Sequence, residues 1–322
     1  MQPDSARELK ARILAGVARS ASAQTSAYDV GEPRPHVAVG LTPAGDGLTR
    51  VAVRLESEAD RALLPDLGRS AEGQVDVRVI GPVRALSSPT APGALQRRVR
   101  PLRPGLSVAH PDVSAGTLGG FVRTDGRLAM LSNNHVLAAS DAAAIGAAVL
   151  QPGPADGGTA RDRVGRLTAF QDLSPGGANL VDAAVAVLDP GVAADPGDLP
   201  GGPLSGPVPG SLDIDPDELV EKVGRTTGHT RGRITAMEVD GVAVQYDEGV
   251  YTFDDQIEIS GRTGAFSQGG DSGSVIWRSR DRAPLGLLFA GSSTGGDGGA
   301  GVTFANPLAT VLALLDAEWV AR

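Results

Sequence analysis

The chain has 322 residues, of which 41% are apolar and 21% are charged, a composition typical of a globular protein. The formal net charge of −9 argues against nucleic acid as a partner, because the phosphate backbone attracts basic surfaces. No apolar run approaches the roughly 20 residues that cross a bilayer, so we expect no membrane partner. Cysteine is absent, and secreted enzymes usually carry disulfides, which favours a reducing, cytoplasmic location.

Residues 1–85 predict a small α+β domain. A capping-box pattern at residues 5–8 precedes Leu9, Ile13 and Val17, whose spacing predicts a helix of about four turns. The apolar stripe of this helix needs a docking surface, either in this chain or in a partner. The rest predicts two strands, a short helix and a third strand, at residues 36–41, 51–55, 57–64 and 75–79. We find no nucleophile, metal cluster or phosphate loop here, so we expect a regulatory or assembly domain that binds a regulatory partner or forms a homo-oligomer.

Residues 86–113 have a different character. Prolines recur, and four arginines lie between Arg97 and Arg103. We interpret the segment as an exposed linker between domains. The alternative is a processing or inhibitory segment that the protein itself cleaves.

From residue 114 to residue 322, short apolar runs alternate with turn residues. Thr124-Asp125-Gly126 lies between two strand-like runs and is a hairpin signal. A crossing rich in proline and glycine at residues 190–216 separates two antiparallel β units of about a hundred residues each. Apolar residues then share one helical face between Pro307 and Val320, which predicts a C-terminal helix.

The stretch from Gly269 to Ser274, with the sequence Gly-Gly-Asp-Ser-Gly-Ser, is a candidate for nucleophilic chemistry. A serine nucleophile needs a neighbouring base and backbone N–H donors for the oxyanion that its attack creates. Glycines beside Ser272 allow a tight turn and leave these donors uncovered. The charge of Asp271 in such a turn must be paired. A polar glycine-rich turn without chemistry has the same pattern, so residues upstream must decide.

Two residues upstream complete the candidate set. Among four histidines, only His135 directly follows a strongly apolar strand, although a structural histidine in a turn is the alternative. Asp182 is the acid that enters the apolar run 179–187, and a lone acid there is costly unless it is paired. A polar strand cap is the alternative for Asp182, and Asp172 and Asp189 are the other candidates for the acid.

The order His135, Asp182, Ser272 and the spacing between them resemble the chymotrypsin-like serine peptidases of the trypsin superfamily. The resemblance covers roughly residues 114–322. It implies a mainly β fold of two antiparallel six-stranded β-barrels with a C-terminal helix, here preceded by the small α+β domain. It also implies that these three residues form a catalytic triad that hydrolyses peptide bonds through an acyl-enzyme.

Lys222, in the sequence Lys-Val-Gly-Arg-Thr-Thr-Gly, resembles the streptogrisin-like branch of this family. There, a basic residue two positions before the glycine pairs with the aspartate that precedes the serine. The resemblance therefore implies that Lys222 pairs with Asp271 and that no activating cleavage is needed. The sequence Ser-Asn-Asn-His-Val at residues 132–136 is similar to that of intracellular trypsin-like proteins of plants (narrow-leaf type) and their bacterial relatives.

The resemblance also implies how a substrate binds. The amides of Gly270 and Ser272 should bind the oxyanion, and an extended peptide should pair with the backbone at Ala290 and Gly291. The pocket for the side chain before the cleaved bond should be formed by Phe266, Ser267, Gln268 and residues 290–292. Because no acid lies six positions before Ser272, we expect poor cleavage after arginine or lysine. We expect no cofactor and no metal.

The sequence departs from the family at two places near the proposed triad. Asn133 and Asn134 stand where many members have alanines, and Phe289 stands where many have a serine that hydrogen-bonds the triad aspartate. The aspartate must then be supported from elsewhere, or the site is poorly arranged. A binding or scaffolding protein with an inactive peptidase fold is therefore the alternative to a regulated endopeptidase, and an esterase acting through the same triad is a third hypothesis.

Overall fold

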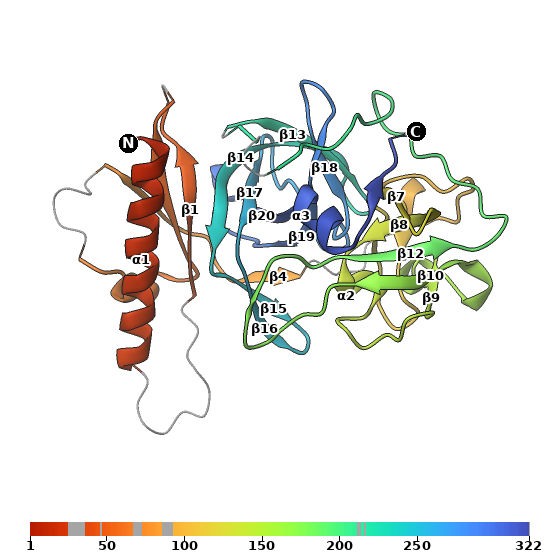
Figure 1. The fold of residues 1–322 in the computed structure, drawn as a ribbon, viewed down its shortest axis with the longest axis horizontal. Helices are drawn as coiled ribbons and strands as arrows, with labels where there is room; N and C mark the ends of the chain where they lie inside the picture. The colour runs from red at the N-terminus through yellow and green to blue at the C-terminus, as the bar shows by residue number, and fades with distance from the viewer. Residues whose placement is uncertain are drawn as a thin grey trace.

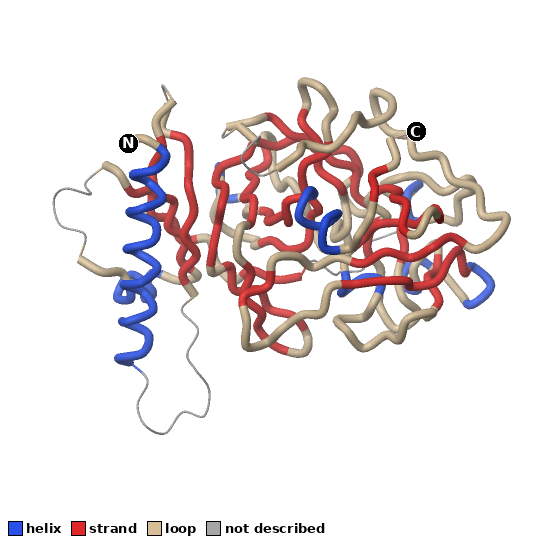
Figure 2. The backbone as a smooth tube through the Cα atoms, in the orientation of Figure 1, coloured by secondary structure: helices blue, strands red, loops and turns tan. Residues whose placement is uncertain are grey.

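The computed structural model describes residues 1–24, 36–45, 47–66, 73–85, 93–210, 214–215 and 217–321. Strands dominate the described chain, so the expected mainly β class is confirmed (Figure 2). One long helix lies at the outer left of the molecule, and the other helices are short. Within the described residues, no helix is both long and apolar enough to cross a membrane.

The N-terminal unit, within residues 1–80, is a helix packed on strands. Its elements are α1 (Pro3–Gln24), β1 (Val37–Pro43), β2 (Thr49–Leu55), the short 3-10 helix η1 (Glu58–Leu63) and β3 (Val75–Val79). Strand β2 is antiparallel to β1 and parallel to β3. Leu9, Ile13 and Val17 share one apolar cluster with Val51 and Val53 of β2. The predicted helix is confirmed and is longer than expected, and the surface that covers its stripe belongs to this chain.

Six strands of the C-terminal part close into a barrel. They are β13 (Leu219–Gly224), β14 (Gly228–Asp240), β17 (Gln256–Gly261), β20 (Thr303–Pro307), β19 (Pro284–Gly291) and β18 (Val275–Arg278). Each strand is antiparallel to the next in this order, and β18 pairs with β13 to close the ring. Strand β14 is long enough to pair also with β1, so the N-terminal unit extends the sheet of the barrel (Figure 1).

A separate antiparallel sheet contains six strands within the described chain. In spatial order they are β21 (Glu318–Trp319), β7 (Gly120–Thr124), β8 (Arg127–Ser132), β12 (Ala184–Leu188), β10 (Arg163–Phe170) and β9 (Ala148–Leu150). The predicted hairpin at Asp125 joins β7 to β8. We call this the six-stranded sheet; its outermost strand, β21, comes from the far end of the chain.

The predicted C-terminal helix is present but shorter than expected. Helix α3 spans Leu308–Leu314, and the chain then turns at Asp316, whose φ of 46° is left-handed and ends the helix. Beyond it, Trp319 pairs with β7 and covers Gly120, where an ideal Cβ would lie only 2.3 Å from the indole ring. The helical pattern between 315 and 320 was therefore misleading, because pairing and packing on β7 take these residues.

A hairpin inserted after β14 borders the barrel. It consists of β15 (Val242–Tyr246) and β16 (Gly249–Phe253), and the short strand β11 (Ala178–Asn179) pairs with β16. Strand β4 (Val83–Ala85), which follows the N-terminal unit, lies between β15 and β19 rather than beside β3. Figure 1 shows β4 among the strands of the C-terminal part.

The expected exposed linker is wrong for residues 93–113; residues 86–92 lie outside the described chain. Leu102 and Leu106 are fully buried in the core of the six-stranded sheet, and Leu102 bridges to Ala194. The stretch contains the 3-10 helix η3 (Ala94–Gln96) and the strand β5 (Ser107–Val108). Strand β5 pairs with β6 (Gly116–Thr117), which follows the stretch. The remaining helical turns are α2 (Asn134–Leu137), η4 (Pro154–Asp156), η5 (Ala160–Asp162) and η7 (Asp297–Gly299).

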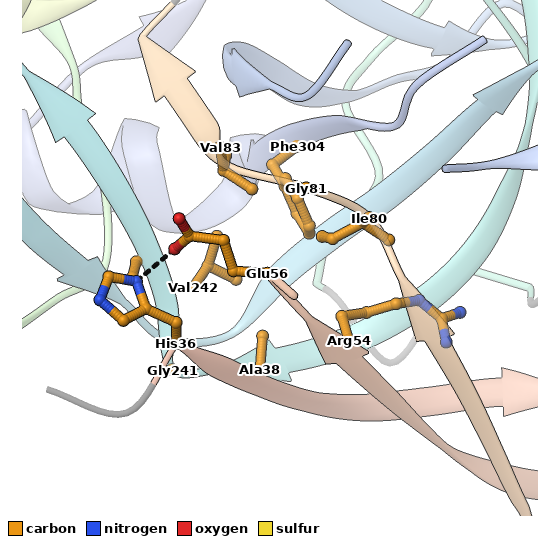
Figure 3. Close-up of a pocket in the computed structure, with 11 residues that line it drawn as sticks. His36, Ala38, Arg54, Glu56, Ile80, Gly81, Val83, Gly241, Val242 and Phe304 are labelled. Atoms are coloured by element: carbon orange, nitrogen blue, oxygen red, sulfur yellow. Dashed lines mark ion pairs between the residues drawn. The ribbon is translucent and has the colours of Figure 1, made fainter. Parts of the chain in front are cut away.

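Charged groups fix the N-terminal unit to the barrel. Arg54 of β2 donates to Glu258 of β17 through Nε (2.7 Å) and Nη2 (3.0 Å), and both side chains are 1% exposed. Between the two bodies remains a cavity of only about 20 Å³, beside the His36–Glu56 ion pair (Figure 3). That volume holds about one water.

Candidate active site

Strand pairing brings His135 and Asp182 together. Ser132, the last residue of β8, is opposite Ala184, the first residue of β12, so the segments just beyond these two ends are neighbours. His135 Nδ1 lies 2.5 Å from Asp182 Oδ2, and the His135 backbone N–H donates to Oδ1 of the same carboxylate at 3.2 Å. Asn133 Nδ2 donates to the Asp182 carbonyl at 2.6 Å. The carboxylate thus holds both the ring and the backbone of the histidine.

The two other candidate acids lie elsewhere. Asp172 is exposed. Asp189 forms an ion pair with Arg163, at 2.7 Å between Oδ2 and Nε. Of the three acids that the sequence offered, only Asp182 contacts His135.

Tyr246 supports Asp182 and was not predicted. Its hydroxyl donates to Asp182 Oδ2 at 2.8 Å, and its ring meets that of His135 edge to face, with centroids 5.7 Å apart. Burial, and secondly the charge of Asp182, raises the pKa of Tyr246 well above its usual value, so the hydroxyl stays a donor. Asn306 Oδ1 accepts the Asp182 backbone N–H at 3.0 Å. Position 289, where the resemblance led us to look for a supporting serine, holds a buried phenylalanine, and the hydroxyl that reaches Asp182 comes from Tyr246 of the hairpin.

The sequence contained a signal for Tyr246. Val242, Val244 and Tyr246 alternate along one strand, and this pattern places all three on the buried face. A tyrosine at the end of such a face buries its ring and needs a partner for its hydroxyl. The partner could not be identified, because nothing in the sequence fixes where the hairpin lies relative to Asp182.

Ser272 lies in a turn between β17 and β18, against the segment that precedes β7. Its carbonyl accepts the Thr117 N–H at 2.7 Å, and its hydroxyl donates to the Phe289 carbonyl at 3.2 Å. An ideal Cβ on Gly116 would lie 2.4 Å from Val136 and 3.1 Å from the Ser272 carbonyl, so the serine is close to the residue after His135. His135 Nε2 is buried and, among the described residues, has no hydrogen-bond partner.

Glycines let this turn approach the six-stranded sheet. Gly273 has a φ of 91°, and an ideal Cβ there would lie 2.1 Å from Ser132 Oγ and 2.3 Å from the Thr117 carbonyl. Gly270 has a φ of 93°, and its carbonyl accepts the Thr117 hydroxyl at 2.9 Å. Any side chain at Gly273 would push Ser272 away from the strand that leads to His135.

Asp271 is fully buried and saturated with donors. Lys222 Nζ lies 3.2 Å from its Oδ2, the Thr227 hydroxyl donates at 2.6 Å, and the amides of Thr226 and Gln268 donate at 2.9 and 3.0 Å. Burial lowers the pKa of Lys222, and the charge of Asp271 opposes this shift. The Lys222–Asp271 pair therefore anchors the turn that contains Ser272 against strand β13.

The expected substrate-binding residues lie in two segments, residues 266–268 before the Ser272 turn and residues 290–291 at the end of β19. The Phe266 side chain is 2% exposed in the barrel core, where apolar residues and Lys222 surround its ring, so its backbone is the part left to contact a substrate. The pocket expected at residues 266–268 and 290–292 stays a prediction. Ser267 Oγ lies 2.6 Å from Thr303 Oγ1, while Gln268 is exposed. Residues 290 and 291 end β19, where both pair with β20 and with β4.

A cleft of about 370 Å³ opens beside His135. Its lining includes Tyr246 and the turn of its hairpin, Ser140, and Ala85 of β4. Three acidic residues line it: Asp112, Asp247 and Glu248. The carboxylates give this opening a negative local potential.

Comparisons with known proteins give similarity in fold only. The solved structures similar to this chain include Thermobifida fusca protease A (17% identity, TM-score 0.48, covering 69% of this chain and 99% of that one). The alignment with Cellulomonas bogoriensis chymotrypsin (20% identity, TM-score 0.46) covers 69% of this chain and 99% of that one. Nocardiopsis protease (19% identity, TM-score 0.48) covers 68% and 98%. No protein-family model matches the sequence, and no curated protein matches it.

Proposed function

We propose that the chain is a serine endopeptidase in which Ser272, His135 and Asp182 form the catalytic triad. The observation that supports this most directly is the buried His135 ring, which Asp182 holds at Nδ1 while Nε2 has no partner among the described residues. Asp182 favours the tautomer with the proton on Nδ1, which leaves Nε2 as the basic nitrogen. An orphaned buried nitrogen is costly in a folded protein, and a reacting hydroxyl would satisfy it.

The reaction begins with a rotation of the Ser272 side chain. Its hydroxyl leaves the Phe289 carbonyl and donates to Nε2 of His135. As Oγ attacks the peptide carbonyl, Nε2 takes the proton and Asp182 stabilises the resulting imidazolium. Backbone N–H groups of Gly270 and Ser272 receive the oxyanion, each contributing about 3 kcal/mol in such sites. Nε2 then gives the proton to the leaving amine, and water hydrolyses the acyl-enzyme by the same steps.

A fluorophosphonate probe tests this proposal, because it forms a covalent bond only with an activated serine. We expect labelling of the full chain that disappears in Ser272→Ala and persists in Ser279→Ala, a serine after β18. Comparing the turnover of a labelled protein with that of a small ester separates an endopeptidase from an esterase. Absence of labelling at any pH between 5 and 9 would falsify the triad.

A peptide-binding protein without catalysis is the second candidate. The observation that favours it is the complete burial of Ser272, whose hydroxyl faces a carbonyl rather than the histidine. Under this hypothesis peptides bind along β19 but are not cleaved. We also propose that the enzyme is regulated and acts in the cytoplasm. The absence of cysteine supports the proposed location.

A further inference from the structure

Strand β4 lies on the backbone that the proposed function assigns to a bound peptide. It is antiparallel to β19, with Ala85 opposite Ala290 and Arg84 opposite Gly291. On its other side it is parallel to β15, with Arg84 opposite Gln245. In Figure 1, β4 lies beside β15 and β19, and β1 lies between β4 and α1. The groove between β15 and β19 is therefore already filled by a strand of the same chain.

The direction of β4 leads to the candidate nucleophile. Because β4 is antiparallel to β19, the chain that advances from Arg84 to Ala85 moves from Gly291 to Ala290, toward Phe289. The carbonyl of Phe289 accepts the hydroxyl of Ser272 at 3.2 Å. The C-terminal end of β4 thus points at Ser272, as the segment before a cleaved bond must.

Burial shows that β4 is seated in the groove. Val83 is 8% exposed and belongs to an apolar cluster with Phe289 and Tyr246, whereas Arg84 is exposed. Ala85 borders the open cleft beside His135. One side chain of β4 is thus inserted into the protein and the next faces water, as expected for a peptide added to a sheet edge.

The N-terminal unit holds β4 at this place. Ile80, just before β4, accepts the Thr294 hydroxyl at 3.1 Å, and its N–H donates to the Leu55 carbonyl at 2.8 Å. The buried Arg54–Glu258 pair fixes the same unit to the barrel. A tethered strand has an effective concentration in the millimolar range for short connections. A free peptide must compete with it.

We propose that the groove between β15 and β19 is the site where an extended peptide binds as an added strand, and that β4 is its resident occupant. Substrates bind only when β4 leaves. This inference deepens the proposed function and rests on it for the chemistry, whereas the competition for the groove can be measured without catalysis.

Arg84→Pro and Arg84→Ala form a matched pair that tests the inference. Both remove the exposed side chain, but only proline removes the backbone N–H of a residue that is paired on both sides. Both are made in full-length Ser272→Ala, and thermal unfolding checks that they are folded. Fluorescence anisotropy measures binding of a fluorescein-labelled, amidated peptide with the sequence of residues 81–85. We expect the proline variant to bind the peptide at least tenfold more tightly than the alanine variant.

A second variant keeps the inference testable if proline prevents folding. The chain has no cysteine, so Arg84→Cys with Gln245→Cys introduces the only pair of thiols. A short, reducible dithiol cross-linker joins β4 to β15 and can be released in the same sample. We expect the cross-linked protein to bind the peptide at least tenfold more weakly than the released protein.

The outcomes separate this inference from the proposed function. Equal peptide affinity for Arg84→Pro and Arg84→Ala, or for the cross-linked and released forms, would overturn the inference even if a fluorophosphonate labels Ser272. Tighter binding by Arg84→Pro without any labelling of Ser272 would support the inference and leave a peptide-binding protein in place of a peptidase.

Discussion

Tyr246 shows how one side chain can replace a missing one. Phe289 leaves the proposed triad aspartate without a hydroxyl from β19, and Tyr246 supplies one from the hairpin. The phenol reaches Asp182 Oδ2, the same oxygen that His135 contacts, so it fixes the carboxylate relative to the ring. We therefore regard Tyr246 as a positioning residue that acts through Asp182.

Tyr246→Phe tests this role. It removes one hydrogen bond to a buried carboxylate and keeps the ring packed against His135. Such bonds contribute about 1.5–3 kcal/mol, so we expect kcat for a peptide substrate to fall by about tenfold or more while KM stays nearly constant. Tyr251→Phe, on the neighbouring strand of the same hairpin, is the control. Equal losses in the two variants would contradict a specific role for the Tyr246 hydroxyl.

Asp255 is a second residue whose environment makes a measurable prediction. Burial, and then the charges of Glu238 and Asp240, raise the pKa of its carboxyl to about 6 from an ordinary value of 3.8. The folded state therefore binds the proton more tightly than the unfolded state. Ionisation of Asp255 therefore lowers the free energy of unfolding. This loss is absent below about pH 4, develops as the pH rises from about 4 to 6, and is complete above pH 6.

Asp255→Asn should remove this penalty. Asparagine tolerates the left-handed φ of 58° and cannot carry the charge. Because the side chain is only partly buried, we expect a gain in unfolding free energy of about 1 kcal/mol at pH 7 that vanishes below about pH 4. Urea unfolding across this pH range measures it. Asp125→Asn, at an exposed position with a φ of 49°, should show no such pH-dependent gain; a gain at Asp255 that does not depend on pH would rule out the electrostatic cause.

Among the elements, those with a local signal were predicted and those formed by distant pairing were not. The helix at the N-terminus, the strands β1, β2 and β3 that follow it, and the hairpin of β7 and β8 have clear periodicity or turn residues, and the structure contains them. Strand β21 was missed because its residues continue a helical pattern and its partner, β7, lies nearly 200 residues earlier in the chain. Strand β4 has only three residues, too few for a periodic signal, and long-range pairing alone defines it.

For the whole molecule, the important feature is that the N-terminal unit and the barrel share one sheet. Strand β1 pairs with β14, and Gly40 of β1 permits the approach, since an ideal Cβ there would lie 2.7 Å from Val239. Arg54 and Glu258 are buried together at this junction. The Thr235 hydroxyl, from β14 of the barrel itself, donates to Glu258 at 2.7 Å, but the cation that pairs with the carboxylate comes from the N-terminal unit. We expect one cooperative unfolding transition for both bodies.

Arg54→Met tests this coupling. It leaves the Glu258 carboxylate buried without its cation, a change that costs about 3–5 kcal/mol in comparable pairs. Arg50→Met, at an exposed position on the same strand, is the control and should change stability by less than about 0.5 kcal/mol. Denaturant unfolding followed by circular dichroism and by tryptophan fluorescence measures both. A similar stability for Arg54→Met and Arg50→Met would show that the pair does not couple the two bodies.

The sequence alone determined the mainly β class, the helix at the N-terminus and the residues of the candidate site, because periodicity, glycine turns and an acid within an apolar run are local features. It favoured Asp182 over Asp172 and Asp189, and the pairing of β8 with β12 is what places Asp182 beside His135. Tertiary structure alone decided that Tyr246 supports that carboxylate and that β4 fills the groove along β19. Both are contacts between segments far apart in the chain, and their energy depends on burial and backbone pairing that exist only after folding.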